Sequence, residues 1–311
     1  MVNDSAPASG ASRIKLGYFS PSVLLAVAET TGALAEAGLE VDASPVSSSP
    51  GQFTALRDGD LDVALTSPDN VLAYRFSPGN PLGTLLDASI VGSVDRGLGL
   101  GLYLRSGLTE ADELRGAVVG VDVATSGFAV ALYALAESLG VGRGEYTLEA
   151  LGSTPRRLEA LLDGRCDATM LNAGNELTAE KHGCRRVASV AEVCTPYLGT
   201  VIAVLGEAHV EAATRLATAM QAVASRVIRG ELDALTHGAA TEVLGLDGDL
   251  ADRYVQRLKD PSEGLTTEPV DIDALGTLVS LRQRYLPEAV DGQDVLAHAL
   301  DPDRGLVRAG A

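Results

Sequence analysis

Apolar and polar residues alternate along most of the chain in blocks that predict strands and helices in turn. Short apolar runs such as Ile14–Phe19 and Val63–Thr66 predict buried strands, and longer runs with apolar residues three and four positions apart predict helices over Val23–Ala37 and Gly127–Leu139. Strands that alternate with helices indicate an α/β fold. The other expected strands span 39–46, 85–94, 98–104, 117–123, 146–151, 166–171 and 198–205, and the other helices span 52–57, 68–76, 155–162 and 175–182.

After residue 205 the pattern is almost entirely helical. Apolar residues recur at helical spacing in 208–228, 231–244, 250–259 and 272–284. This tail lacks the strands for a domain of its own, so we expect it to pack back on the first part of the chain. Residues 1–12 are rich in Ser, Ala, Pro and Gly, and we expect them to form a disordered arm.

The two halves of the strand-and-helix region repeat one local pattern. The stretches LRDGDLDVALTSPDN (56–70) and LLDGRCDATMLNAGN (161–175) each contain the end of a helix, an Asp-Gly turn, an apolar strand and a polar, turn-forming segment. A repeat at this long spacing predicts two related lobes rather than a solenoid. We expect residues 13–100 together with 200–311 to form lobe 1, and residues 101–199 to form lobe 2.

Composition agrees with a two-domain globular protein and excludes some partners. The chain has 311 residues, more than one hydrophobic core usually serves. A formal net charge of −18 argues against nucleic acid and anionic membrane surfaces, which bind basic patches. Three cysteines, Cys166, Cys184 and Cys194, cannot form a fully paired disulfide framework, although a single Cys184–Cys194 bridge stays open.

The first residues do not read as an export signal. They contain no basic segment followed by an apolar one, and no Cys that would carry a lipid. No apolar run approaches the ~18 residues that span a bilayer, so no membrane insertion is expected. The sequence as it stands predicts a cytoplasmic protein, or an extracellular or periplasmic one if the native start lies upstream.

Several stretches resemble one known superfamily. The stretches GYFSP (17–21), GALAEAGLEVD (32–42) and LRGAVVGVDVATSGFA (114–129), with the two repeat copies, resemble type 2 periplasmic-binding proteins. The closest branch contains the alkanesulfonate, nitrate and thiamine-pyrimidine-precursor binding proteins. The resemblance covers roughly residues 13–205. It implies a two-lobed fold with a two-strand hinge, a helical C-terminal tail packing on lobe 1, and a ligand in the cleft.

Polar residues follow the predicted strands at the positions where open α/β sheets bind ligands. In lobe 1 these residues come after the first and third strands, and in lobe 2 after the equivalent strands. The predicted ligand-binding residues are Tyr18, Phe19, Ser20, Ser67, Asp69, Asn70, Thr125, Ser126, Gly127, Asn172, Asn175 and Glu176.

Most of these residue types also have a purely structural interpretation. Ser67 or Asp69 would cap the helix that begins at Pro68, and Thr125 or Ser126 would cap the next lobe's helix. The free N–H groups of the same helix starts would also bind an anionic or carbonyl group, so the two interpretations are compatible. The aromatic ring of Tyr18 suits stacking on a flat ligand, whereas Phe19 suits either the site or the core.

The chemistry of the lobe 2 candidates is open in the same way. Asn172 is suited to a direct hydrogen bond, because its amide both donates and accepts. Glu176 is either a general acid/base or a negative charge that favours a helix start. Gly97, Gly99 and Gly101 alternate at strand period and predict a crossing strand, not a phosphate loop.

No cofactor or metal is expected. His182 lies near Cys184 and Cys194, but no CxxC pair or fourth nearby ligand completes a metal site. No nucleophile elbow occurs either.

Two functions follow. The first is a binding protein whose lobes close on a small anionic or heteroaromatic metabolite, with an ABC permease as partner only if the protein is exported. The second is a cytosolic enzyme on the same fold, such as a lyase or decarboxylase, with Tyr18, Asp69, Glu176 or His182 in proton transfer. We favour the first, because the sequence predicts a ligand pocket but no convincing group of catalytic residues.

Overall fold

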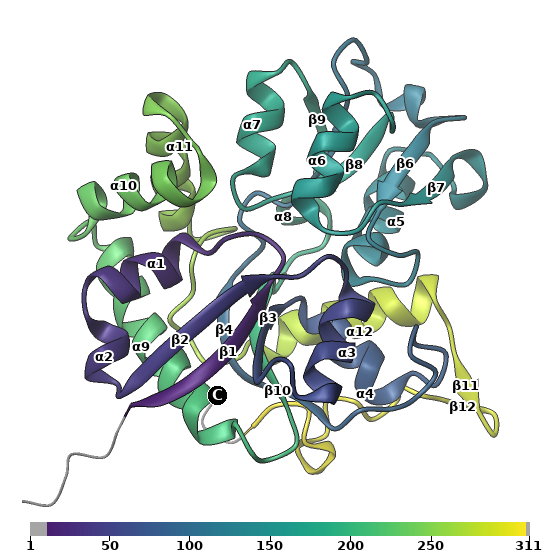
Figure 1. Cartoon of the computed structure of the whole chain (residues 1–311). Helices are drawn as coiled ribbons and strands as arrows, with labels where there is room; N and C mark the ends of the chain where they lie inside the picture. Colours follow the sequence, from purple (N-terminus) through teal and green to yellow (C-terminus); the bar gives the residue numbers. More distant parts are fainter. Residues whose placement is uncertain (1–10, 309–311) are drawn as a thin grey trace, which may run out of the picture.

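The computed structural model describes residues 11–308 and contains two five-stranded sheets (Figure 1). This arrangement confirms the predicted α/β fold with two lobes. We call the body around the first sheet lobe 1 and the body around the second sheet lobe 2. Sheet 1 has the order β2-β1-β3-β10-β4, with β1 Ser12–Tyr18, β2 Leu39–Pro45, β3 Val63–Thr66, β4 Ala88–Asp95 and β10 Thr200–Leu205. Sheet 2 has the order β7-β6-β8-β5-β9, with β5 Gly101–Leu104, β6 Val118–Val121, β7 Thr147–Ala150, β8 Ala168–Leu171 and β9 Arg185–Ser189.

The two sheets have equivalent topology. In sheet 1, β1 pairs in parallel with β2 and β3, and β10 runs antiparallel between β3 and β4. In sheet 2, β6 pairs in parallel with β7 and β8, and β5 runs antiparallel between β8 and β9. In each sheet, the antiparallel strand between two others, β10 or β5, is therefore the first strand after the chain has crossed from the other lobe. The chain crosses between the lobes twice, through 96–100 and 194–199.

The two crossing segments lie against each other. The Gly199 N–H donates to the backbone oxygen of Asp95 at 2.9 Å, and a Cβ on Gly199 would lie 2.4 Å from the Gly97 nitrogen. The strand predicted over 98–104 is wrong in its first half, because Gly97, Leu98 and Gly99 have φ of 119°, 48° and 80° and β5 begins only at Gly101. The turn brings Gly99 against Arg257, whose guanidinium nitrogen would lie 2.2 Å from a Cβ there.

The helices cover the sheets in the order that the sequence predicts, with one break. The helix expected over 23–37 ends at Thr30, because Gly32 adopts a left-handed conformation (φ 80°) and the Thr30 and Thr31 hydroxyls bond back to carbonyls of the preceding turn. In lobe 1 the helices are α1 Val23–Thr30, α2 Ala33–Glu36, α3 Ser49–Asp58 and α4 Pro68–Phe76. In lobe 2 they are α5 Gly127–Ser138, α6 Thr154–Leu162, α7 Asn175–Lys181 and α8 Val190–Val193.

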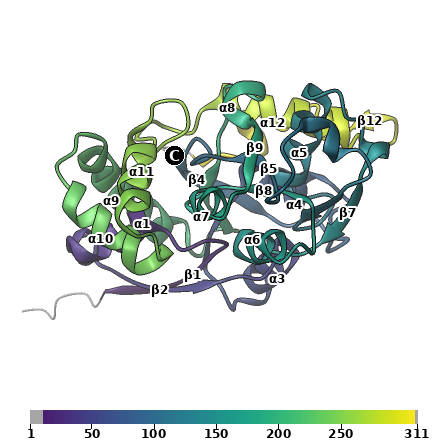
Figure 2. The same cartoon turned by 90° about the horizontal axis from the view of Figure 1, so that it is seen from above.

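The C-terminal tail packs on lobe 1, as expected, and also reaches lobe 2. Its helices are α9 Val210–Ile228, α10 Asp233–Leu244, α11 Gly248–Lys259 and α12 Ile272–Tyr285, followed by the hairpin of β11 Ala289–Val290 and β12 Gln293–Asp294. Helix α9 packs on β4 and β10, and α10 on α1, whereas α12 contacts both α4 of lobe 1 and α5 of lobe 2 (Figures 1 and 2). The sequence pattern did not predict β9, α8 or the hairpin.

Some further expectations concern the ends of the chain and the cysteines. Residues 1–10 of the expected disordered arm lie outside the described residues, and Ser12 is already the first residue of β1. Cys166, Cys184 and Cys194 are buried and unpaired. Among residues 11–308, no helix combines the length and apolar character needed to cross a membrane.

Candidate ligand-binding site between the lobes

The carboxyl ends of β1, β3, β6 and β8 meet around one cavity between the lobes. It measures about 870 Å³, part of it open to solvent, and residues of both lobes line it. Parallel strands of open sheets present their carboxyl ends to ligands, which explains why the residues after these strands gather there. Eight of the twelve predicted ligand-binding residues line the cavity, and their role in binding stays a prediction: Tyr18, Phe19, Ser20, Ser67, Asn70, Ser126, Gly127 and Asn172.

Two of the other four predicted residues, Asp69 and Thr125, contact Arg282 of the tail. Asp69 is fully buried, and its Oδ2 accepts from Nη1 of Arg282 at 2.6 Å. The same guanidinium donates to the backbone oxygen of Thr125 at 3.2 Å. Arg282 comes from α12 of the tail, so this contact joins the tail to a helix start in each lobe.

The remaining two predicted residues also make structural contacts. The Asn175 side chain donates to Ser20 Oγ of the other lobe at 3.2 Å and to the backbone oxygen of Asn172 at 2.9 Å. Glu176 is fully buried and accepts from the Gly174 N–H at 2.8 Å. Asn175 therefore lies where the lobes touch, and Glu176 is a buried residue of the first turn of α7.

The starts of α4 and α5 face the cavity with different capping. Ser67 is the N-cap of α4, and its hydroxyl accepts from the Asp69 N–H at 3.3 Å, which confirms the capping interpretation. Ser126 holds the N-cap position of α5 but makes no capping bond, and its buried hydroxyl has no partner among the described residues. Ser126 therefore keeps a hydroxyl group available at a helix N-terminus.

Arg157, on α6, brings a positive charge to the cavity. Its side chain is buried, and its hydrogen bonds go to three uncharged oxygens, the backbone oxygens of Gly152 and Met170 and the Thr154 hydroxyl. Its Nε has no partner within the described residues. Burial lowers the pKa of Arg157 to about 10 and the negative charge of Asp122 opposes that fall, so Arg157 stays protonated at neutral pH. A buried charge without a direct counter-ion favours a negative ligand.

Two carboxylates also line the cavity, and they differ in how they are bonded. Asp122 Oδ2 accepts from the Ser49 N–H of the other lobe at 2.9 Å, whereas its buried Oδ1 has no partner in residues 11–308. Asp95 Oδ1 accepts from the Gly97 N–H at 2.7 Å, and burial raises the pKa of Asp95 to about 6.

Arg157 and Asp122 were not among the predicted site residues, although each had a signal in the sequence. Arg157 lies on the buried face of α6 together with Ala160 and Leu161. Its spacing of three and four positions from these two apolar residues was the sequence signal that it is buried. Asp122 directly follows β6, at the strand end where ligands are expected.

The other wall of the cavity is apolar. It is formed by side chains of lobe 1, from α1, β3, β4 and the crossing segment, and of the tail, from α11 and the segment that follows it. These residues include Leu24, Leu65, Val94, Leu98, Tyr254, Leu258 and Leu265. The cavity thus combines an apolar wall with a group of polar and charged side chains.

The two lobes contact each other directly around the cavity. The Ser153 N–H donates to the backbone oxygen of Ser47 at 2.9 Å, and the Gly127 N–H donates to Asn70 Oδ1 at 3.3 Å. The contact is tight at Gly127, where a Cβ would lie 2.5 Å from Ser67 Oγ. The structure therefore shows a cleft in which the lobes have come together.

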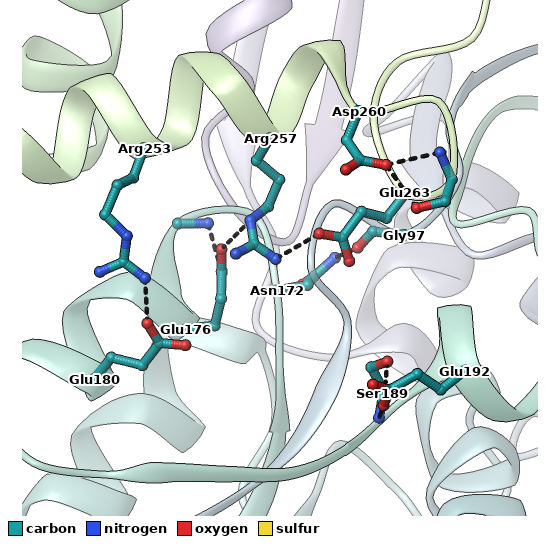
Figure 3. Close-up of polar contacts among 12 residues, drawn as sticks. Gly97, Asn172, Glu176, Glu180, Ser189, Glu192, Arg253, Arg257, Asp260 and Glu263 are labelled. Carbon is teal, nitrogen blue, oxygen red and sulfur yellow. Dashed lines mark hydrogen bonds and ion pairs between the residues drawn. The ribbon is translucent and has the colours of Figure 1, made fainter.

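Tail helix α11 is tied to lobe 2 beside the crossing segments (Figure 3). Arg257 Nε lies 3.6 Å from Glu176 Oε1, and its Nη1 donates to Glu263 at 2.9 Å. Burial raises the pKa of Glu176 to about 7, and the charge of Arg257 opposes that rise. One turn away, Arg253 pairs with Glu180.

The four residues considered for proton transfer do not come together. Tyr18 lines the cavity, but Asp69 and Glu176 are held by arginines of the tail outside its lining. His182 is exposed, and its Nδ1 lies 2.9 Å from the Thr178 backbone oxygen. In the described part of the chain, no three His, Cys, Asp or Glu side chains are grouped to hold a metal ion.

Comparisons with known proteins agree with this architecture. Nitrate-binding NrtA from Synechocystis PCC 6803 superimposes with a TM-score of 0.74 at 12% identity, over 96% of this chain and 86% of that one. The alkanesulfonate-binding protein SsuA from Xanthomonas axonopodis pv. citri, bound to MOPS, gives a TM-score of 0.70 at 16% identity, over 90% and 96% of the two chains. For aliphatic sulphonate-binding SsuA from Escherichia coli the TM-score is 0.64 at 16% identity, with 90% of each chain covered.

At these identities the structural likeness shows the fold, and the sequence family is established separately. A search of curated proteins found no match. Residues 18–244, most of the chain, match the family described as ABC transporter, phosphonate, periplasmic substrate-binding protein. With its two lobes, its double crossing and its cavity between the strand ends, the chain belongs to this family of ABC-transporter substrate-binding proteins.

Proposed function

We propose that this protein is a solute-binding protein that closes its lobes on a small organic anion. The observation that carries the proposal is Arg157, a buried cation in the cavity lining whose hydrogen bonds all go to uncharged oxygens. An anion that reaches this guanidinium gains a charge-assisted hydrogen bond in a desolvated site. The N-terminus of α5 adds a partial positive charge at Gly127.

The apolar part of the cavity lining supports an organic rather than an inorganic ligand. The apolar wall formed by Val94, Leu258 and Leu265 has no hydrogen-bonding group to offer a small hydrated ion. An alkyl or ring portion would bury apolar surface there while its anionic group faces Arg157. The names of the family and of the structural neighbours refer to phosphonate, sulfonate and nitrate, which are all anions.

The proposal includes delivery of the ligand to an ABC permease, and therefore a periplasmic or extracellular place of action. Its support is the family, whose members are periplasmic substrate-binding proteins of ABC transporters. The enzyme alternative has no group of residues to carry it, since of its four candidates only Tyr18 lines the cavity.

A panel of small anions, each paired with a neutral or cationic compound of similar shape, tests the proposal. We expect alkyl anions to raise the melting temperature of the wild type and to bind in calorimetry. Replacement of Arg157 by Met should weaken this binding by at least about tenfold, the loss of ~1.4 kcal/mol or more that a charge-assisted hydrogen bond gives. Exposed Arg165, in the turn that follows α6, provides the matched control, and R165M should bind as the wild type does.

Three outcomes would contradict the proposal. The first is a wild type that binds neutral or cationic compounds in preference to anions. The second is an R157M variant that keeps full affinity. The third is a bound anion that is consumed during incubation, which would favour the enzyme.

A further inference from the structure

We infer that Leu98 and Ala173 are positioning residues that set the free-energy cost of closing the lobes. Both adopt a left-handed backbone conformation in the closed form alone, and a ligand in the cleft compensates for that strain. The inference rests on the proposed function, because it concerns how the lobes close on the anion. It adds the place in the backbone where the closing movement is absorbed.

The first observation is that left-handed residues other than glycine gather at the cavity. In the part of the chain that the structure describes there are three, Leu98, Ala173 and Asp291, with φ of 48°, 54° and 51°. A residue with a Cβ is strained in this conformation, and the strain persists only where surrounding contacts impose it. Asp291 lies in the turn of the β11–β12 hairpin, whereas Leu98 and Ala173 both line the cavity.

The two strained residues of the cavity are bonded to each other. The Ala173 N–H donates to the backbone oxygen of Leu98 at 3.0 Å. Beside it, the Asn172 side chain donates to the backbone oxygen of Gly97 at 3.1 Å (Figure 3). Leu98 belongs to the segment that crosses between the lobes, and Ala173 follows β8 of lobe 2. The carbonyl groups of the crossing turn are thus attached to lobe 2.

The N–H groups of the same segment are attached to the tail. The Leu98 N–H donates to the backbone oxygen of Glu263 at 2.7 Å, and the Arg96 N–H donates to that of Gly264 at 2.9 Å. The Glu263 carboxylate accepts from Arg257 Nη1 at 2.9 Å, which fixes this loop on α11 (Figure 3). Helix α11 packs on α9 and α10, which cover lobe 1. Leu98 is therefore held from the side of lobe 1 at its N–H and by lobe 2 at its carbonyl.

Movement of one lobe against the other has to change the torsion angles between these two attachments. The φ and ψ angles of Leu98 lie between its N–H and its carbonyl, and hinge movements are absorbed by a few such loop residues. The lobes have come together in this structure, so the left-handed angles belong to the closed form. Opening lets Leu98 and Ala173 return to an unstrained conformation. A ligand that contacts these two lining residues favours the closed form.

The test uses glycine substitutions, because glycine adopts a positive φ without this strain. Ala173→Gly removes one methyl group and relieves the strain. Leu98→Gly is compared with Leu98→Ala, since both lose the isobutyl group from the cavity lining and only the glycine relieves the strain. Asp291→Gly is the matched control, because it relieves strain of the same kind at a residue outside the cavity lining.

Two readouts are measured on each variant. Spin labels on two introduced cysteines, D58C in α3 and D163C after α6, report the distance between the lobes by double electron–electron resonance. Both positions are exposed, and the three native cysteines are buried. Calorimetry gives the affinity for butylphosphonate, an alkyl anion of the proposed class. Circular dichroism and melting temperature show that each variant folds.

We expect the unliganded wild type to be mainly open and to close when butylphosphonate is added. In A173G the ratio of closed to open molecules should rise at least about fivefold, the factor that corresponds to the left-handed strain of one residue. The affinity for butylphosphonate should rise by a similar factor. The closed-to-open ratio of L98G should exceed that of L98A in the same proportion, and D291G should match the wild type in both readouts.

The inference is overturned if A173G matches the wild type in both readouts, because the strain would then be equal in the open and closed forms. An unliganded wild type that is already closed also overturns it, as does a D291G variant that shifts closure as A173G does. When butylphosphonate binds the wild type in any of these cases, the proposed function stands and only the inference falls. If no anion of the panel binds but A173G still raises the closed fraction, the inference holds and the proposed function fails.

Discussion

At the scale of single residues, the notable side chains are buried arginines. Arg157 in the cavity lining and Arg282 between the lobes are 2% and 3% exposed, a degree of burial that arginine reaches only when its charge is compensated or used. Arg282 forms an ion pair with Asp69, whereas Arg157 donates hydrogen bonds only to uncharged oxygens among the described residues and feels the charge of Asp122 without an ion pair to it. The ion pair therefore marks Arg282 as a structural arginine, whereas Arg157 in the cavity lining is available to a ligand.

This difference predicts that Arg282 matters for stability. Replacement of Arg282 by Met leaves the buried carboxylate of Asp69 without its counter-ion, which typically costs about 3–5 kcal/mol. Urea denaturation should show a loss of that size in the free energy of unfolding. The double variant D69N/R282M, which removes both charges, should recover part of it. A loss below ~1 kcal/mol for R282M would show that the pair is not stabilising.

The raised pKa of Glu176 predicts how the stability of the folded protein depends on pH. Burial raises its pKa to about 7 from a model-peptide value near 4.5, so between these values the folded protein binds a proton that the unfolded chain has released. Its contribution to stability is therefore fully present below about pH 4.5 and is lost as the pH rises through 7.

The comparison with Glu176→Gln isolates this contribution. The free energy of unfolding of the wild type, minus that of the variant, should decrease between about pH 4.5 and pH 7.5. Urea denaturation of both proteins across this range measures the difference. A difference that stays constant with pH would mean that Arg257 keeps Glu176 ionised throughout.

These residues also show where sequence reasoning ends. Ser67 and Ser126 were identified because they follow apolar strands and precede helices, a local pattern. Asp69 has the same local pattern, but it does not line the cavity, and its carboxylate pairs with Arg282, which lies 213 residues further along the chain. Arg157 gains its role from burial. The pairing of Asp69 is not encoded near that residue, whereas the burial of Arg157 has one local signal, the apolar Ala160 and Leu161 on the same face of α6.

At the scale of elements, the starts of α4 and α5 approach each other across the cleft. Gly127 begins α5, and a Cβ there would lie 2.5 Å from Ser67 Oγ and 3.0 Å from the Asp69 Cβ of lobe 1. Its φ is not in the left-handed region, so within lobe 2 alone an alanine would fit a helix start. The glycine is needed only when the lobes meet.

We therefore expect Gly127→Ala to weaken ligand binding by about tenfold while leaving the melting temperature of the unliganded protein close to that of the wild type. The clash raises the free energy of the closed form, and closure is required to surround the ligand. Calorimetry with the best anion of the panel measures the effect.

The matched control is Gly238→Ala in α10, where an added Cβ meets no atom within 4 Å. This variant should bind as the wild type does. Equal binding by G127A would contradict closure at this contact. In S67A/G127A, removal of the Ser67 hydroxyl should restore part of the affinity.

The order of the elements was predictable, and their ends less so. Helix α4 and strand β3 occupy the predicted ranges, because a Ser-Pro start and an apolar run of four residues are strong local signals. The crossing segment at Gly97–Gly99 was predicted as a strand, since alternation of Gly and Leu imitates strand period. Its turn is set by contacts with Arg257 and with Asn172, whose amide donates to the Gly97 oxygen, and both come from distant parts of the chain.

At the scale of the whole molecule, the tail acts as a third body that touches both lobes. The family match ends at residue 244, yet α11 and α12 beyond it supply Arg257 and Arg282 to the junction and Tyr254 and Leu258 to the cavity lining. The resemblance of residues 13–205 to periplasmic-binding proteins predicted the lobes and the cleft. The tail's part in the site comes from packing alone.

In the function that we propose, the cleft retains a small anion through Arg157 and leaves it unchanged. The most direct measurement is native mass spectrometry of wild type and R157M, each re-isolated from an extract of the cells that make the protein. We expect one anionic metabolite bound to the wild type, one molecule per protein molecule, unaltered after prolonged incubation and absent from R157M. A neutral or cationic ligand, equal retention by R157M, or a ligand converted to another compound would contradict it.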